Sequence, residues 1–285
     1  NRDNYRLIRK GGSYQSFLRS IAAGLIHRDG PRDAVVEVWN GFPFFTPLWT
    51  QCPNIAILHH FHGPLWPTVL PTPLAGFGSL IEKVIAPPIY RQTPIVTLSQ
   101  SSRNTLREET RLKEKNISVV QPGISEDFFP GGSLAPEPTV VAVGRLTPYK
   151  KIDRLISVLA EVRKSIPTVR LEIIGTGNAE YGLRLHAARL GGGSWVRFLG
   201  HVSKEDLIDS YRRAWIVASC SISEGWGMSI TEAASCQTPA VATRIPGHVD
   251  AIEDGYSGYL VESEEEFIEK ISVLSYMVFE KLAPY

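Results

Sequence analysis

The residues best suited to chemistry lie in one glycine-containing segment, SEGWGMSITE at positions 223–232. Its glycines let the backbone turn tightly and come close to a ligand. The segment opens a predicted helix, whose first backbone N–H groups lack acceptors within the helix and form a site for an anion. Those groups belong to three residues: Gly227, Met228 and Ser229. Glu232, on the helix, can accept two hydrogen bonds from a vicinal diol such as that of a ribose, and Glu224, in the loop, can do so for a sugar. A solvated helix position is the alternative for Glu232, and the glycines favour the functional interpretation.

A second candidate segment, GRLTPYKK at positions 144–151, also joins a predicted strand to a predicted helix. Arg145 offers a planar fork of N–H groups to phosphate oxygens, and Lys150 offers a compact positive charge. Two cations here would stabilise the negative charge that grows on a departing diphosphate. A solvated basic loop is the alternative, and the presence of the first segment favours the phosphate site.

Strands and helices that alternate along the C-terminal half must position both segments. Short apolar runs predict strands at 139–143, 169–174, 196–199, 215–219, 240–242 and 258–261. Helices are expected at 151–165, 179–190, 203–214 and 228–236, and a last one follows Ser263; Ser203 and Ser263 are predicted N-caps. Such alternation indicates a parallel sheet with helices on both faces, in which ligands bind beyond the carboxyl ends of the strands.

The N-terminal half has a weaker form of the same pattern. Strands are expected at 34–38, 55–58, 95–98 and 117–120, and helices at 14–26 and 101–110. Residues 63–88, rich in Pro, Leu and Trp, are expected to form a long loop with one apolar helix near 77–85. Three prolines and two glycines within 130–138 mark a boundary, so we predict domains at 1–135 and 136–285. The first carries 14 Lys and Arg against 10 Asp and Glu, and the second 16 against 19.

Several other chemistries are disfavoured. Gly175-Thr176-Gly177 follows a strand as in a dinucleotide site, but the third glycine is replaced by Glu180. No P-loop, GxSxG or HExxH motif occurs. The histidines at 59, 60 and 62 have no cysteine or carboxylate at zinc-ligand spacing, and no Asp-x-Asp motif is present to hold a divalent cation. We therefore expect neither a metal nor a resident cofactor.

The composition of the 285-residue chain, 43% hydrophobic with a net charge of +1, is that of an ordinary globular protein. The near-neutral balance argues against a nucleic-acid partner. Three widely spaced cysteines without a CxxC pair are expected to be small buried side chains rather than a disulfide framework. Because residues 1–10 are polar and no run of 18 apolar residues exists, we predict a cytoplasmic protein.

The C-terminal half resembles the donor domain of glycosyltransferase family 4, whose members are retaining enzymes of the GT-B fold. The Glu-x7-Glu signature of that family corresponds to Glu224 and Glu232, and its Gly-Arg-Leu-x-Pro-x-Lys signature to residues 144–150. Further matches occur at 174–177, 198–202 and 254–261. The resemblance, strongest over 121–263, implies an α/β fold of two Rossmann-like, doubly wound parallel-sheet domains that face each other across a cleft.

The N-terminal half resembles the acceptor domain of that family less closely. The apolar run 55–58 ends at His59, which fits the histidine that lies beside the reacting sugar in the family. His62 is the second candidate for this position. The alternative interpretation of His59 is a polar residue in the cleft between the domains, without a role at the sugar. The first strands of the family, with their glycine-rich loop, find no room before residue 34, and its last helices find none after Tyr285. We therefore expect an incomplete N-terminal domain and a chain truncated at both ends.

The resemblance implies a metal-independent hexosyltransferase of glycan biosynthesis. It would move a hexose from a UDP- or GDP-linked sugar to a glycan or lipid-linked acceptor, with retention at the anomeric carbon. The implied roles are stabilisation of the diphosphate by Arg145, Lys150 and the helix start at Met228, ribose binding by Glu232, and contact with the sugar by Glu224 and His59.

Two kinds of alternative remain. One is a non-catalytic, nucleotide-sugar-binding remnant of the fold, and the other is a sugar-nucleotide epimerase or a phosphorylase on the same fold. The apolar stretch 63–88 could also face the acceptor or make a peripheral contact at the inner face of a membrane, with internal packing as its alternative.

Overall fold

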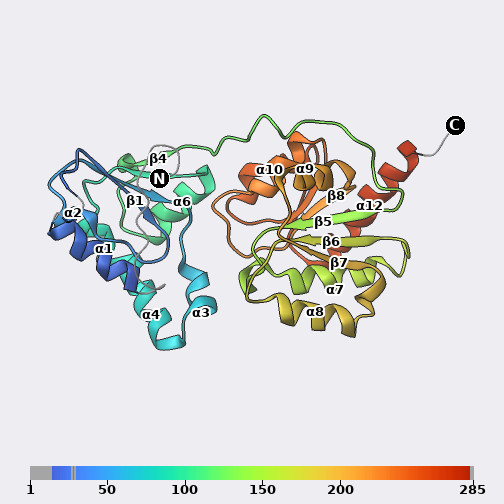
Figure 1. Cartoon of the computed structure of the whole chain (residues 1–285), viewed down its shortest axis with the longest axis horizontal. Coiled ribbons are helices and arrows are strands. Elements are labelled where there is room, and N and C mark those ends of the chain that lie inside the picture. The colour runs from blue at the N-terminus through green and yellow to red at the C-terminus, as the bar shows by residue number, and fades with distance from the viewer. Residues whose placement is uncertain (1–14, 27, 29, 283–285) are drawn as a thin grey trace. The chain divides into compact units, whose positions relative to one another are not determined.

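The computed structural model describes residues 15–26, 28 and 30–282 and divides into two compact units (Figure 1). The first unit comprises Asn1–Leu98 and Ser102–Val120, and the second comprises Ser99–Ser101 and Gln121–Tyr285. Both units are built on parallel sheets covered by helices, which confirms the predicted fold class.

The second unit has a six-stranded parallel sheet in the order β10-β9-β8-β5-β6-β7. Its strands are β5 (Thr139–Val143), β6 (Arg170–Ile174), β7 (Val196–Gly200), β8 (Ile216–Ser219), β9 (Ala240–Thr243) and β10 (Gly258–Val261). The chain builds outward from β5 through β6 and β7, and then returns to the other side of β5 with β8. The carboxyl ends of β5 and β8 therefore form the switch point of the sheet, which is where ligands of such folds bind.

Helices cover both faces of this sheet. On one face pack α7 (Ile152–Val162), α8 (Glu180–Arg189) and α12 (Glu264–Leu282), and on the other α9 (Lys204–Arg213) and α10 (Met228–Ser235). The short elements are α11 (His248–Ala251), η4 (Pro148–Lys150) and η5 (Gly192–Ser194). Val140 and Ala142 of β5 join the core beneath α7, whereas Val141 joins the core beneath α9. Burial on both faces explains why β5 is apolar at nearly every position.

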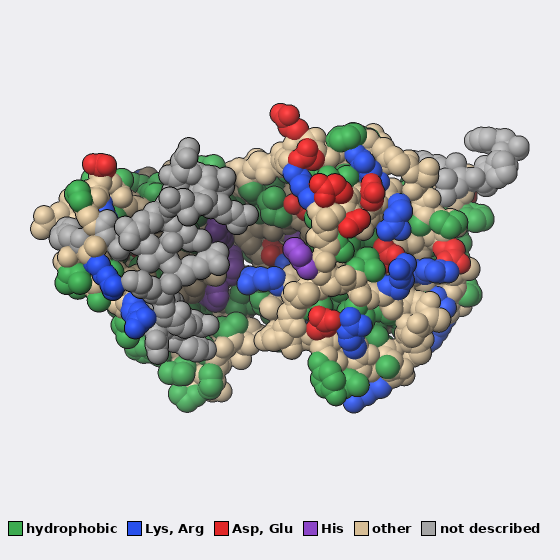
Figure 2. All heavy atoms as spheres, in the orientation of Figure 1, with side chains coloured by type: hydrophobic (Ala, Val, Ile, Leu, Met, Phe, Trp, Pro, Cys, Tyr) green, Lys and Arg blue, Asp and Glu red, His purple; other side chains and the backbone are tan. Residues whose placement is uncertain are grey.

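The elements expected in the C-terminal half are all present, with ends that differ by a few residues. Both predicted N-caps are confirmed, because Ser203 Oγ accepts from the Asp206 amide and Ser263 Oγ from the Glu266 amide, each at 3.1 Å. Cys220 and Cys236 are buried, as predicted, whereas Cys52 is only partly so. Figure 2 shows acidic and basic side chains interspersed over the visible face of this unit, in line with the small net charge.

The segment 121–135 lies with the second unit, although we assigned it to the first domain. It lacks helices and strands, but it is bound along α9. Arg212 Nε donates to the carbonyl of Phe129 at 3.0 Å, and the amide of Ala135 donates to the carbonyl of Arg213 at 2.9 Å. The division therefore falls after Val120, before the proline- and glycine-rich stretch that we used to predict it.

The first unit has a four-stranded parallel sheet in the order β1-β2-β3-β4. Its strands are β1 (Val35–Trp39), β2 (Asn54–Leu58), β3 (Ile95–Thr97) and β4 (Ile117–Val119). Its helices are α1 (Gln15–Leu25), α2 (Thr46–Trp49), α3 (Trp66–Val69), α4 (Thr72–Leu80), α5 (Ala86–Ile89) and α6 (Gln100–Glu109), with 3-10 turns η1 (Gly63–Leu65) and η3 (Glu114–Asn116) and the π-helical turn η2 (Ile81–Ile85). Large buried side chains such as Trp39, Leu58 and Tyr90 form its core.

The expectation of a long loop at 63–88 is wrong, because this stretch is helical almost throughout. Pro67 and Pro73 stand in the first turns of α3 and α4, where an amide N–H has no acceptor within the helix and its absence costs little. The apolar helix expected near 77–85 is the end of α4 continued by η2. Among the described residues, no helix combines the length and the apolar character that a membrane span requires.

Candidate functional site

A pocket of about 300 Å³ opens at the carboxyl ends of β5 and β8, at the switch point of the second sheet. Its lining comprises Val143, Gly144, Lys150, Ser219, Glu224, Trp226, Gly227, Met228, Ser229, Glu232 and His248. Six of the eight predicted site residues are in this lining: Lys150, Glu224, Gly227, Met228, Ser229 and Glu232. Larger hollows, of about 420 and 560 Å³, lie beside β10 and at the amino ends of β2 and β3, and they contain none of the predicted residues.

Glu224 is held through one of its two carboxylate oxygens. Lys150 Nζ forms an ion pair with Oε1, and Ser221 Oγ donates to the same oxygen at 2.7 Å. Ser221 is itself fixed, because Thr243 Oγ1 donates to its carbonyl at 2.6 Å. Oε2 of Glu224 has no hydrogen-bond partner in the described part of the chain, and it is available to a ligand hydroxyl.

Gly227 ends the loop and begins α10. A Cβ atom at this position would come within 2.8 Å of Ile230 Cδ1 and 3.1 Å of Ala251 Cβ, so a residue with a side chain would have to displace both neighbours, and glycine lets the loop pack closely on α11. The amides of Met228 and Ser229, in the first turn, have no acceptors within the helix. The positive end of the α10 dipole therefore faces the pocket and favours an anion there.

Glu232 lies in the second turn of α10. The hydroxyl of Tyr211 on α9 donates to Oε2 of Glu232 at 2.9 Å. The other oxygen, Oε1, has no hydrogen-bond partner among the described residues. Burial raises the pKa of Glu232, against the opposing effects of the Tyr211 hydrogen bond and the charge of Lys204. Each of the two signature glutamates thus has one oxygen bound by the protein and one left for a ligand.

Gly175 and Gly177, which do not form a dinucleotide-binding motif, allow the loop after β6 to lie against the loop after β5. A Cβ atom on Gly175 would overlap the carbonyl oxygen of Gly144, and one on Gly177 would overlap that of Leu146. The backbones are joined there by hydrogen bonds such as Leu146 N to Thr176 O at 3.0 Å. These glycines therefore set the position of the segment that carries Lys150.

His248 lines the pocket and was not predicted as a site residue. It is 1% exposed, its Nδ1 lies 2.8 Å from the carbonyl oxygen of Thr243, and its Nε2 lies 3.2 Å from Ser219 Oγ. Burial lowers its pKa. The sequence offered only the glycine before it, because the φ of +87° at Gly247 and its close approach to the Glu224 carbonyl, which bring this histidine to the pocket, are seen in the structure alone.

Arg145 lies outside the pocket lining. Its side chain is exposed, and its Nη2 donates to the hydroxyl of Tyr149 at 3.0 Å. Lys150, five residues later, is the cation of the 144–151 segment that the structure brings to Glu224.

In the first unit, two buried carboxylates hold the loops that follow β1 and β2. Glu37 accepts hydrogen bonds from Tyr90 Oη at 2.7 Å and Thr46 Oγ1 at 2.6 Å. Glu82, on η2, accepts from the amides of His62 and Gly63 at 2.7 and 3.0 Å and from the indole of Trp66 at 3.0 Å. Burial raises the pKa of Glu82 to about 7.

The predicted His59 directly follows β2 and is half-buried, at the carboxyl edge of the first sheet. The rings of His60 and His62 stack with their centroids 4.8 Å apart. Burial, aided by His60, lowers the pKa of His62 to about 4, so this ring is neutral at pH 7. Within the described ranges, no group of three or more His, Cys, Asp or Glu side chains is arranged to hold a metal ion.

Residues 124–275, which include the whole pocket, match the family described as glycosyl transferases group 1. The match covers more than half of the 285 residues. The chain belongs to this family. It is 38% identical over 165 residues to the D-inositol 3-phosphate glycosyltransferase of Mycobacterium sp. (strain KMS), covering 52% of this chain and 36% of the relative. It is 37% identical over 204 residues to the enzyme of the same name from Segniliparus rotundus, covering 67% of this chain and 44% of the relative.

Solved structures share the fold of this chain. Sucrose-phosphate synthase from Thermosynechococcus elongatus aligns with a TM-score of 0.75 at 16% identity, over 94% of this chain and 71% of that one. WaaG, a glycosyltransferase involved in lipopolysaccharide biosynthesis, aligns with a TM-score of 0.74 at 16% identity, over 95% and 76%. Anabaena HepE, solved with UDP and glucose, aligns with a TM-score of 0.71 at 19% identity, over 92% and 73%. The Rossmann-like GT-B architecture expected from the sequence is therefore shared with glycosyltransferases of known structure.

Proposed function

We propose that this group 1 glycosyltransferase belongs to family 4 and transfers a hexose from a nucleotide-diphosphate sugar to a glycan or lipid-linked acceptor, with retention and without a metal ion. The observation that carries the proposal is the combination of groups in the 300 Å³ pocket. A helix start and Lys150 match an anionic diphosphate, while Glu224 and Glu232 each offer one free oxygen to hydroxyl groups. A nucleotide sugar carries both kinds of group on one molecule.

In the proposed reaction, the bond between the anomeric carbon and the diphosphate oxygen breaks, and a bond to the acceptor oxygen forms on the same face. The acceptor proton passes to the leaving phosphate oxygen, so no protein nucleophile is required. Lys150 and the amides of Met228 and Ser229 stabilise the charge that develops on the diphosphate. Arg145 joins them in this proposal by turning from the Tyr149 hydroxyl, because its exposed side chain lies outside the pocket lining. Glu232 binds the ribose, Glu224 orients the transferred sugar, and His59 hydrogen-bonds that sugar.

The similar proteins support a nucleotide-sugar donor and do not indicate one acceptor. HepE was solved with UDP and glucose, and the curated relatives are D-inositol 3-phosphate glycosyltransferases. We therefore propose UDP as the first nucleotide to test, with GDP as the second.

The test begins with a thermal-shift screen of UDP- and GDP-linked hexoses. Release of nucleoside diphosphate is then measured with the stabilising donor and a panel of acceptors, with and without EDTA. The anomeric configuration of the product is read by proton NMR. We expect retention and no effect of EDTA. Arg145→Ala and Glu232→Ala variants that release nucleoside diphosphate at the wild-type rate would contradict the assignment.

A second candidate function is binding of a nucleotide sugar without transfer. The pocket groups that match a nucleotide sugar, among them Lys150, Glu224 and Glu232, would serve binding alone as well as transfer. The chain spans 36% of the length of the Mycobacterium relative and 44% of the length of the Segniliparus relative. Calorimetric binding of a UDP- or GDP-sugar with no product in any acceptor reaction would favour this candidate over the enzyme.

We also propose a peripheral contact with an anionic membrane through the apolar surface of α3, α4 and η2. Exposed side chains there are Val69, Leu74, Phe77, Leu80, Val84 and Ile85, and Figure 2 shows hydrophobic side chains at the α3–α4 end of the first unit. The excess of basic residues in 1–135 matches an anionic surface. The test is flotation with liposomes that contain phosphatidylglycerol. Leu74→Glu and Phe77→Glu should reduce flotation, and failure of the wild-type chain to float would reject the contact.

A further inference from the structure

The glutamate proposed to bind the ribose is held by one buried tyrosine. Tyr211 is 0% exposed, and its hydroxyl donates to Glu232 Oε2 at 2.9 Å. We infer that Tyr211 is a positioning residue for Glu232, which holds Oε2 so that Oε1 is presented to the ribose diol. This inference rests on the proposed role of Glu232 in binding the nucleotide.

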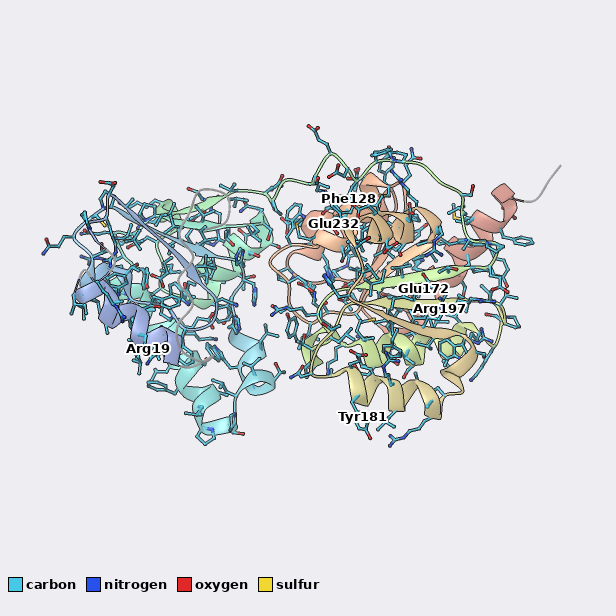
Figure 3. The ribbon with its side chains drawn as sticks, in the orientation of Figure 1. Arg19, Phe128, Glu172, Tyr181, Arg197 and Glu232 are labelled. Atoms are coloured by element: carbon cyan, nitrogen blue, oxygen red, sulfur yellow. The ribbon has the colours of Figure 1, made fainter. Side chains whose placement is uncertain are left out.

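The tyrosine can position the carboxylate because it is itself immobilised. Thr238 Oγ1 donates to its carbonyl at 2.6 Å, and the ring of Phe128 packs on its ring with centroids 6.1 Å apart. Figure 3 labels Phe128 and Glu232 close together, in agreement with this chain of contacts through Tyr211. The hydroxyl therefore comes to Glu232 from a fixed direction.

The carboxylate needs such a partner because Glu232 is only partly solvated. A glutamate side chain has several rotamers, and one rigid donor selects among them before the ligand arrives. The hydrogen bond also favours the ionised form, which accepts from both ribose hydroxyls. The other charged or titratable groups around Glu232 are Lys204 on α9, Cys236 directly after α10, and the pocket residues Lys150, Glu224 and His248.

The experiment compares the calorimetric affinity of the full chain for UDP and for 2′-deoxy-UDP, with GDP and 2′-deoxy-GDP run in parallel. The wild-type chain should prefer the ribonucleotide. Tyr211→Phe removes one oxygen atom and should weaken UDP binding about tenfold, the equivalent of 1.4 kcal/mol, with a much smaller effect on 2′-deoxy-UDP. The matched control is Ser210→Ala on the same helix. It removes a buried hydroxyl, which donates to the Asp206 carbonyl and makes no hydrogen bond with Glu232.

Two readouts separate positioning from a general structural role. Without the Tyr211 donor the pKa of Glu232 rises further, so the loss of UDP affinity at acid pH should begin at a higher pH in Tyr211→Phe than in the wild type. In the background of Glu232→Ala, Tyr211→Phe should have no further effect on UDP affinity. An unchanged pH profile, or an undiminished effect of Tyr211→Phe in that background, would overturn the inference.

The outcomes also separate this inference from the proposed function. A wild-type chain that binds both nucleotides equally would overturn the ribose role of Glu232 and the inference with it. A wild-type preference that survives in Tyr211→Phe would overturn the inference alone. If Tyr211→Phe does not fold, Glu232→Gln replaces it. With its amide oxygen bound by Tyr211, the glutamine must present its NH₂ group to the ribose hydroxyls, which then accept one neutral hydrogen bond instead of donating to a carboxylate, so UDP should bind more weakly than to the wild type. Wild-type affinity in Glu232→Gln would show that the side chain can exchange the positions of its oxygen and nitrogen, so that Tyr211 does not fix it, and would overturn the inference.

Discussion

Lys150 Nζ is paired with Glu224 Oε1 across 74 residues of sequence, and this pair joins the loops that follow β5 and β8. Both side chains are largely buried, with 19% and 16% of their surface exposed. The cation proposed for the diphosphate is thus held by the carboxylate proposed for the sugar. Binding of a donor brings a second negative charge to a lysine that is already oriented, so little reorganisation is needed.

Replacement of Lys150 by Met should therefore reduce both catalysis and stability. The side chain keeps its length, but the diphosphate loses a cation and Glu224 loses its ion-pair partner. We expect kcat to fall about 10²-fold and the free energy of unfolding to fall by about 1 to 3 kcal/mol. Steady-state kinetics and urea denaturation measure the two effects.

The exchanged pair Lys150→Glu with Glu224→Lys is the control for this prediction. It restores opposite charges and should recover part of the stability, but it places a carboxylate where the diphosphate binds, so activity should stay low. An active exchanged pair would contradict the role of Lys150 at the diphosphate.

Glu224 and Glu232 should bind different parts of the donor, the hexose and the ribose. Glu232→Ala should weaken the binding of UDP and of a UDP-hexose about equally, because both carry the ribose. Glu224→Ala should weaken the binding of a UDP-hexose about tenfold more than the binding of UDP, where one charge-assisted hydrogen bond to the hexose is lost. The binding of UDP changes only through the loss of the ion pair with Lys150. Calorimetry with the two ligands on each variant measures this division. Equal losses for both ligands in Glu224→Ala would contradict it.

Gly175 should tolerate no side chain. Its φ is +131°, and a Cβ atom would overlap the carbonyl oxygen of Gly144, which is backbone and cannot rotate away. Gly175→Ala should lower the free energy of unfolding of the second unit by at least about 3 kcal/mol, measured by urea denaturation. The matched control is Gly182→Ala in α8, where a Cβ atom meets nothing within 4 Å. It should stabilise by roughly 0.5–1 kcal/mol, and a comparable loss in both variants would contradict the prediction.

The sheet of the second unit could be predicted from the sequence because its strands are buried on both faces and appear as short apolar runs between amphipathic helices. The pairing of Tyr211 with Glu232 could not, because it spans 21 residues and arises from the packing of α9 on α10. The same limit applies to His248, whose place in the pocket depends on a turn at Gly247. The prediction for 63–88 was wrong for another reason. A proline-rich segment has the same composition whether its prolines stand in the first turns of helices or in a loop.

Glu82 should make the loop after β2 sensitive to pH. It has no exposed surface and binds the amides of His62 and Gly63, and burial raises its pKa to about 7 from an ordinary value of 4.5. Because the folded state holds the proton more tightly than the unfolded state, the stabilisation is complete below about pH 4.5 and is lost as the pH rises through about 7. The loss amounts to at most about 3 kcal/mol.

Hydrogen exchange in the full chain measures this effect locally. Protection of a peptide covering residues 61–66, corrected for intrinsic exchange, should fall between pH 5 and 8 in the wild type relative to Glu82→Gln, which does not titrate. Lys83→Gln is the control, because it removes the neighbouring charge and leaves the three donors to Glu82 in place. A difference in protection between the wild type and Glu82→Gln that stays constant from pH 5 to 8 would show that Glu82 does not titrate in this range, and that its carboxylate is held ionised by the amides of His62 and Gly63 and the indole of Trp66.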